Sequence, residues 1–259
     1  LSLVGSEMCI RDSYKEGMDR KLGPSDNLDD FCRKAQLINY ESHRAIFEAW
    51  NSKMWNDASG VLLWMSHPAW PSMVWQIYSW DYETFGSFYG CRKACEPIHI
   101  QKNLDDQKVV VVNTSLKEIK GAKVIYEVYS LEGKSLFKRT SKLNVLANGL
   151  TECFVQDKPI SASGVYMERL ILQDKRGKVI SINDYWQDNG EGDFQGFNAL
   201  EEASINCKLI RQEKSQIQIE LQNTGAMPAL ALKLNVREAD TDKRILPAYA
   251  SDGYFNLLP

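Results

Sequence analysis

The sequence predicts a multidomain protein with an α/β segment followed by two all-β units, and three observations carry this prediction. Apolar residues recur at helical spacing between residues 28 and 50, and a continuous apolar run follows at 60–65. From residue 98 onward, short apolar runs alternate with turn residues, which is typical of a β-sandwich. A length of 259 residues is enough for about two domains of ordinary size.

Composition excludes several classes of protein. Charged residues make up 25% of the chain and the net charge is −3, as in an ordinary globular protein. No basic patch indicates a nucleic-acid partner, and no run of 18 apolar residues indicates a membrane span. Cys91 and Cys95 stand four residues apart without further Cys or His at metal-binding spacing. We therefore expect buried free thiols, no metal and no cofactor; the other cysteines are Cys9, Cys32, Cys153 and Cys207.

The first thirteen residues are treated apart. Residues 3–13 resemble a translated sequencing-library adaptor read in frame, which makes 1–13 an assembly artefact and places the start of the protein near Tyr14. This interpretation also implies a reading frame cut within a gene. The alternative is a genuine frayed N-terminus.

Two helices are expected before residue 97. Asp26 or Asn27 can cap a helix that runs to about Lys53, because its apolar positions follow helical spacing. A short second helix is expected at 85–95, ended by Pro97. His43 falls on the first helix, where we expect a surface or hydrogen-bonded imidazole.

The run at 60–66 is predicted to be a buried parallel strand. A helix, a short loop and a buried strand form the repeat of a (β/α)8 (TIM) barrel, so residues 14–96 are expected to be the C-terminal end of one. Six of the seven tryptophans lie between Trp50 and Trp80. Aromatic rings at the exit of a barrel strand indicate a sugar-binding rim, since barrel sites lie at the C-terminal strand ends. The alternative is a packed core that happens to be rich in tryptophan.

The rest of the chain is predicted to form two immunoglobulin-like β-sandwiches, at 97–190 and, incompletely, at 191–259. A polar, Gly-rich linker at 188–193 separates them. Each unit contains a strand that ends in Asn-Thr, at Asn113 and at Asn223, which suggests a related design. The expected strands are 109–112, 122–130, 149–154, 165–172 and 179–186, then 203–211, 216–222 and 229–236.

Several segments together carry a resemblance to a known family. They are 27–36, Tyr40, Glu41, Trp64, Met65, Trp70, Trp75, Gln76, Tyr89, Gly90, Lys93, Ala94, 96–101, 244–247 and 251–259. These residues resemble glycoside hydrolase family 2, in its exo-β-D-glucosaminidase and endo-β-mannosidase branch. The segment 60–101 carries the resemblance most specifically, and the sandwiches alone would carry little.

The resemblance implies a retaining exo-glycosidase, which uses two carboxyl groups about 5–5.5 Å apart. The family carries them on the fourth and seventh barrel strands, whereas 60–66 matches the eighth, so no catalytic residue is expected in this chain. Trp64 matches the tryptophan that forms the floor of the sugar subsite, and His67 and Trp70 follow as candidate substrate contacts. Asp81 and Glu83 are expected to be solvated rather than catalytic.

The resemblance further implies a secreted or periplasmic enzyme that takes an oligo- or polysaccharide substrate. The chain itself is expected to be inactive. Two alternatives from other classes stay open: a non-catalytic carbohydrate-binding β-sandwich module, and a structural or adhesive protein of tandem sandwiches. The expected helix-to-strand transition at 27–66 argues against both alternatives, because neither needs a piece of barrel.

Overall fold

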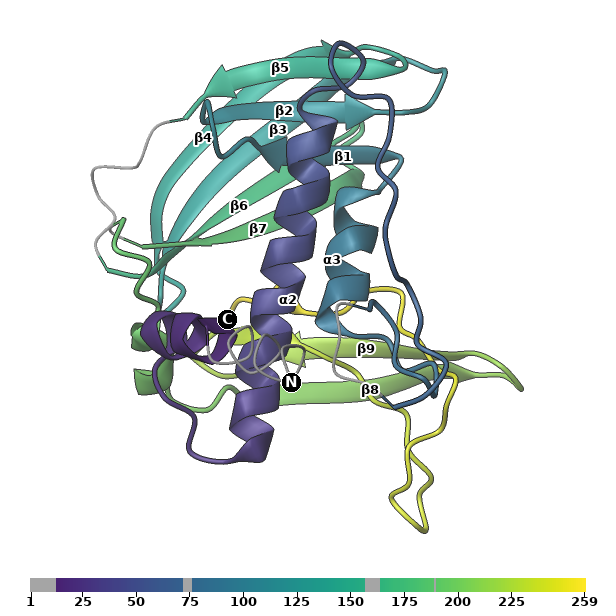
Figure 1. Cartoon of the computed structure of the whole chain (residues 1–259). Helices are drawn as coiled ribbons and strands as arrows, with labels where there is room; N and C mark the ends of the chain where they lie inside the picture. The colour runs from purple at the N-terminus through teal and green to yellow at the C-terminus, as the bar shows by residue number, and fades with distance from the viewer. Residues whose placement is uncertain (1–12, 72–75, 157–163, 189) are drawn as a thin grey trace, which may run out of the picture.

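The structure is a computed structural model that describes residues 13–71, 76–156, 164–188 and 190–259. Two helices, α2 (Leu28–Asn51) and α3 (Gly86–Ala94), lie side by side against a β-sandwich, and a second set of strands lies below the sandwich in the view of Figure 1. Residues 13–22 form a further helical stretch. No helix in the described parts of the chain is long and apolar enough to cross a membrane.

Helix α2 begins as the sequence predicts. The side chain of Asn27 accepts a hydrogen bond from the backbone N of Asp30 (3.0 Å), which satisfies one of the free N–H groups of the first turn. Helix α3 packs closely on α2 because two of its residues are glycines. A Cβ atom on Gly86 would lie 2.1 Å from Gln36 O, and one on Gly90 would lie 2.3 Å from Tyr40 O. Only glycine allows the two backbones to come this near.

The predicted strand at 60–66 is wrong for this structure. These residues form no strand, and the side chain of Leu62 is fully exposed at 99%. A β-strand needs at least one hydrogen-bonded neighbouring strand, and none of the described strands pairs with this segment. The C-terminal end of a (β/α)8 barrel is therefore not visible in the described residues, although α2 and α3 form where helices were expected.

The β-sandwich is built from strands β1 to β7. One sheet has the order β1-β2-β5 and the other β4-β3-β6-β7, all antiparallel (Figure 1). The bounds are β1 (Ile98–Lys102), β2 (Lys108–Asn113), β3 (Ile119–Ser130), β4 (Ser135–Val145), β5 (Gly149–Val155), β6 (Tyr166–Gln173) and β7 (Val179–Gln187). Five of these were predicted, and β1 and β4 were not. The domain limits 14–96, 97–190 and 191–259 stay a prediction.

The core of the sandwich is apolar with one ionic group inside it. Ile100, Val109 and Tyr126 are completely buried between the sheets. Among them, Lys102 Nζ lies 2.9 Å from both carboxylate oxygens of Glu168, and Tyr126 donates a hydrogen bond to the same carboxylate (2.9 Å). This pairing offsets the cost of burying two charges, which would be high for either alone.

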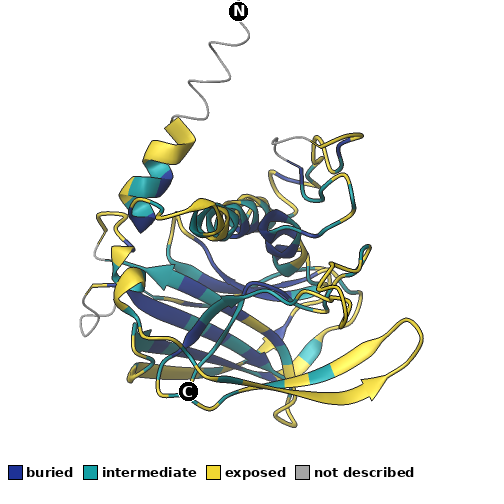
Figure 2. Ribbon diagram, turned by 90° about the horizontal axis from the view of Figure 1, so that it is seen from below, coloured by how far each residue is buried: buried dark blue, intermediate teal, exposed yellow. Residues whose placement is uncertain are grey.

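The second β unit consists of two strand pairs. β8 (Ile205–Gln212) pairs with β9 (Ile217–Asn223), and β10 (Ala229–Leu232) pairs with β11 (Phe255–Leu257). The short 3-10 helix η1 (Gln195–Ala199) precedes them. Most of β8 and β9 is exposed, whereas β1, β2 and β6 of the sandwich are largely buried (Figure 2).

The two Asn-Thr motifs have matching surroundings, which supports a related design of the two units. Asn113 Nδ2 donates to the carbonyls of Lys117 (2.9 Å) and Leu146 (2.8 Å), and Thr114 N donates to Pro97 O. In the second unit, Asn223 Nδ2 donates to Met227 O (2.7 Å) and Leu257 O (3.1 Å), and Thr224 N donates to Ser204 O. Each asparagine thus joins the end of its strand to the loop that follows and to a second segment, which is the turn after β4 for Asn113 and the end of β11 for Asn223.

The cysteines differ from the prediction. Cys91 is buried and Cys153 half-buried, but Cys32, Cys95 and Cys207 are exposed, so the expectation of buried thiols is wrong for these three. Cys32 lies on the outer surface of α2 and Cys207 on the exposed strand β8, where no second layer covers them. Cys9 and Trp75, and residues 3–12 of the adaptor-like segment, lie outside the described residues.

Candidate functional site: an aromatic loop

The three predicted substrate-binding residues lie on one loop and differ in exposure. Trp64 is 79% exposed and Trp70 is 68% exposed. His67 is half-buried, and its ring stacks on that of Tyr82 with the centroids 4.7 Å apart. Exposed indole faces suit the apolar face of a sugar ring. His67 offers less, because Tyr82 covers one face of its ring.

The loop continues into a tight turn that carries Trp80. Ile77 N donates to Ser66 O (3.1 Å), which ties the turn to the Trp64 segment. Ser79 N donates to Glu83 O (3.0 Å), and Glu83 N donates to Ser79 Oγ (3.0 Å). Beside this turn is an open hollow with a volume of about 420 Å³. Its lining residues are Pro71, Ser79, Trp80, Asp81, Glu83, Phe85 and Arg244.

Arg244 comes from the second β unit, so the hollow joins segments that are far apart in the sequence. It pairs with Glu83 and also with Asp81, where Nη2 and Oδ2 are 3.7 Å apart. Lys233 pairs with Glu83 as well. Glu83 is therefore ion-paired with 14% of its side chain exposed, and the expectation that it is solvated is wrong. The reason is the approach of two cations from the second β unit, which the local sequence does not reveal.

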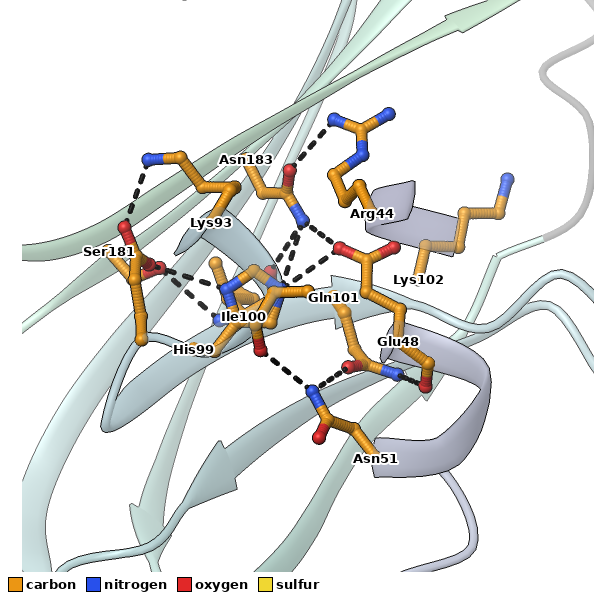
Figure 3. Close-up of polar contacts among 12 residues, drawn as sticks. Arg44, Glu48, Asn51, Lys93, His99, Ile100, Gln101, Lys102, Ser181 and Asn183 are labelled. Atoms are coloured by element: carbon orange, nitrogen blue, oxygen red, sulfur yellow. Dashed lines mark hydrogen bonds and ion pairs between the residues drawn. The ribbon is translucent and has the colours of Figure 1, made fainter. Parts of the chain in front are cut away.

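A second polar group, the buried polar cluster, lies where α2 meets the sandwich (Figure 3). It consists of Arg44, Glu48, Glu96, His99, Asn183 and Tyr185. Glu48 Oε1 accepts hydrogen bonds from His99 Nε2 (2.9 Å), Asn183 Nδ2 (2.7 Å) and Tyr185 OH (2.9 Å). In the sequence, the signal for this cluster is the alternation of His99 and Gln101, which places both on one face of a strand.

Charge in the buried polar cluster is balanced by contacts. Burial disfavours a charged imidazole, yet the hydrogen bonds from His99 to Glu48 and Glu96 outweigh it and raise the pKa of His99. Burial would raise the pKa of Glu96, but His99, Lys93 and Ser181 lower it to about 2. The guanidinium of Arg44 lies 4.5 Å from the centroid of the Tyr185 ring, a cation–π contact.

The residues around the hollow can bind a ligand, whereas those of the buried polar cluster stabilise the contact between α2 and the sandwich. Glu48 and His99 are buried, and neither lines the hollow beside Trp80. A smaller cavity of about 20 Å³, lined in part by Leu37 and Phe194, has room for about one water molecule. No group of three or more His, Cys, Asp or Glu side chains in the described ranges is placed to hold a metal ion. His43, the other imidazole on α2, is half-buried with Nδ1 2.9 Å from Asn39 O, as expected.

Comparisons with known proteins find relatives that are named as glucosaminidases and mannosidases. Residues 183–259 match the family described as the exo-β-D-glucosaminidase Ig-fold domain. The mannosylglycoprotein endo-β-mannosidase of Lilium longiflorum is 29% identical over 92% of this chain, which covers 32% of that protein. The exo-β-D-glucosaminidase of Amycolatopsis orientalis is 29% identical over 95% of this chain, which covers 27% of it.

A solved structure agrees over nearly the whole chain. The exo-chitosanase of Amycolatopsis orientalis, in complex with PNP-β-D-glucosamine, superposes with a TM-score of 0.84 at 27% identity. The match covers 94% of this chain and 32% of that one. A β-D-mannosidase from Dictyoglomus thermophilum shares the fold, with a TM-score of 0.72 at 18% identity. The chain spans a third or less of the length of the relatives it matches.

Residues 183–259 are therefore similar to the Ig-fold domain of exo-β-D-glucosaminidases. More particularly, the comparisons confirm the resemblance of the chain to the exo-β-D-glucosaminidase and endo-β-mannosidase branch of glycoside hydrolase family 2.

Proposed function

We propose that this chain is part of a retaining glycoside hydrolase that cleaves β-glucosaminides or β-mannosides. The observation that carries the proposal is the superposition on the exo-chitosanase over 94% of this chain. Hydrolysis with retention needs one carboxyl group as acid and base and a second as nucleophile. Asp81 and Glu83 are engaged in ion pairs with Arg244, so neither is offered as one of these groups.

In this proposal, residues 14–96 are the last part of a (β/α)8 barrel and 60–66 becomes its eighth strand once neighbouring strands are present. The exposure of Leu62 and Trp64 supports this role, because an apolar run at the protein surface is favoured to bury itself against another element. Trp64 then forms the floor of the sugar subsite, and Trp70 lies beside it. A secreted or periplasmic location is part of the same proposal.

A chimera tests the proposal. The part of the Amycolatopsis orientalis exo-β-D-glucosaminidase that aligns with residues 14–259 is replaced by this chain. We expect the chimera to hydrolyse p-nitrophenyl β-D-glucosaminide, and the chain alone to hydrolyse no aryl β-glucosaminide or β-mannoside, because the catalytic carboxyl groups come from the relative.

The parent enzyme is the positive control, and the parent without the aligned part is the negative one. Turnover by the purified chain alone would refute the assignment of chemistry to other segments. A chimera that is folded, by its circular dichroism and melting, but has no turnover would refute the proposal that the two segments are functionally equivalent.

A further inference from the structure

We propose that the hollow beside Trp80, here called the Trp80 hollow, binds a pyranose unit of an oligosaccharide at a site separate from Trp64. The ligand class rests on the proposed function. The site itself rests on the geometry of Pro71, of residues 79–85 and of Arg244, which belongs to the second β unit.

The size and lining of the Trp80 hollow suit a sugar ring. Its volume of about 420 Å³ falls within the range of about 300–1,000 Å³ that is typical of small-molecule sites. Trp80 is 51% exposed, so its indole is accessible for stacking, and Pro71 and Phe85 add apolar surface. Sugar rings combine apolar C–H faces with hydroxyl edges, and the lining provides a partner for each.

The polar side of the Trp80 hollow is formed by Asp81, Glu83 and Arg244. A guanidinium has five N–H donors, and the two ion pairs of Arg244 leave others for ligand oxygens. Its side chain is 43% exposed and that of Asp81 is 27% exposed, so both are accessible from solvent. The carboxylates can accept hydrogen bonds from the hydroxyl groups of a sugar, and the guanidinium can donate hydrogen bonds to the oxygens of those hydroxyl groups. A sugar hydroxyl can therefore act as a donor or as an acceptor at this site.

Contacts within the turn and from two other segments hold the polar side of the Trp80 hollow in place before a ligand arrives. The turn is closed by the hydrogen bonds of Ser79 with Glu83, and Tyr82 stacks on His67. Lys233 and Arg244 hold Glu83 from the second β unit. A site fixed in this way loses little conformational entropy on binding, which favours affinity.

Binding to this chain tests the inference without any catalysis. The glucosamine trisaccharide with β-1,4 linkages and the corresponding mannotriose are titrated into the purified chain by calorimetry. We expect at least one of them to bind, and Trp80→Ala to weaken that binding by about tenfold or more, because the stacking surface is lost. Arg244→Gln is expected to weaken binding as well, whereas Trp50→Ala, a comparably exposed tryptophan on α2, leaves it unchanged.

Melting temperatures show whether each variant is folded. Asp81→Asn keeps the shape of the side chain and removes its charge. This variant replaces Arg244→Gln as the test of the polar side if Arg244→Gln destabilises the turn, and we expect it to weaken binding as well. Absence of binding by both trisaccharides, or binding that Trp80→Ala leaves unchanged, overturns the inference. Neither result affects the chimera, whose activity tests the proposed function independently.

Discussion

His99 is a buried residue whose pKa is raised by the carboxylates beside it, so its charge makes the stability of the fold depend on pH. Its ring nitrogens face Glu48 of α2 and Glu96 of the loop before β1, while Asn183 and Tyr185 of β7 and Arg44 of α2 complete the buried polar cluster. The pKa of His99 is raised in the folded protein, so folding favours the protonated ring. This stabilisation is fully present below the unfolded pKa of about 6.5 and is lost as pH rises through the folded pKa.

We therefore expect the free energy of unfolding of the native chain to exceed that of His99→Gln by its full margin at pH 5–6, below the unfolded pKa of about 6.5. The margin should shrink as pH rises further. Urea unfolding of both proteins between pH 5 and 9 measures it. His43→Gln is the matched control, since His43 is half-buried and its Nδ1 contacts a backbone carbonyl, that of Asn39, rather than a carboxylate. A margin that is constant across this range, or that grows with pH, would refute the prediction.

At the scale of elements, the contact between α2 and α3 depends on two glycines. A methyl group at Gly86 or Gly90 would overlap backbone atoms of α2, which cannot move aside as the end of a side chain can. We expect Gly90→Ala to destabilise the chain by about 1–3 kcal/mol, as overpacking of a close contact does. Gly17→Ala is the control: it lies in the helical stretch 13–22 with open space around it.

The control should be neutral or slightly stabilising, because alanine is the better helix former. Thermal or urea unfolding of the three proteins gives the comparison. Equal stability of Gly90→Ala and Gly17→Ala would show that the two helices can separate without cost, contrary to the packing described here.

The sequence predicted those elements whose own residues carry a clear apolar pattern, and missed those whose burial depends on contacts with distant segments. Strands such as β2 and β6 were predicted because their own residues carry the apolar pattern. β1 was not, because its polar residues His99 and Gln101 are buried against α2, which a local pattern cannot show. β4 was missed because most of its residues are exposed. The predicted strand at 60–66 was wrong because its formation depends on neighbours that the described residues do not supply.

The candidate site was predicted in part for the same reason. The aromatic residues were evident in the sequence, and the structure places Trp64 and Trp70 on the surface of one loop. The contribution of Arg244 could not be predicted, since it lies more than 150 residues from Asp81 and meets it only when the second β unit folds back. The partners of Glu48 in the buried polar cluster are similarly distant.

At the scale of the whole molecule, the helices join the two β units. The sandwich holds α2 through the buried polar cluster, and the second β unit holds α3 through Tyr254, whose ring lies 5.9 Å from that of Tyr89. Arg92 donates to Ala250 O (3.1 Å), and Lys93 pairs with Asp252 (3.4 Å). The segment 251–259, known from the sequence only as a motif, thus connects the end of the chain to the helices that precede the sandwich.

The proposed function predicts that replacing Trp64 has different effects in this chain alone and in the chimera. Because its side chain is 79% exposed, Trp64→Ala should change the free energy of unfolding of this chain by no more than about 0.5 kcal/mol. In the chimera the same change should reduce kcat/KM for p-nitrophenyl β-D-glucosaminide by about tenfold or more, since the ring supplies a flat contact to the sugar.

A rise in KM alone would mean that the ring contacts the sugar equally in the ground and transition states. A fall in kcat would mean that the ring stacks better on the distorted sugar of the transition state. Trp50→Ala in the chimera is the control for a tryptophan on the surface of α2. A folded Trp64→Ala chimera with unchanged kinetic constants would show that this ring does not contact the sugar.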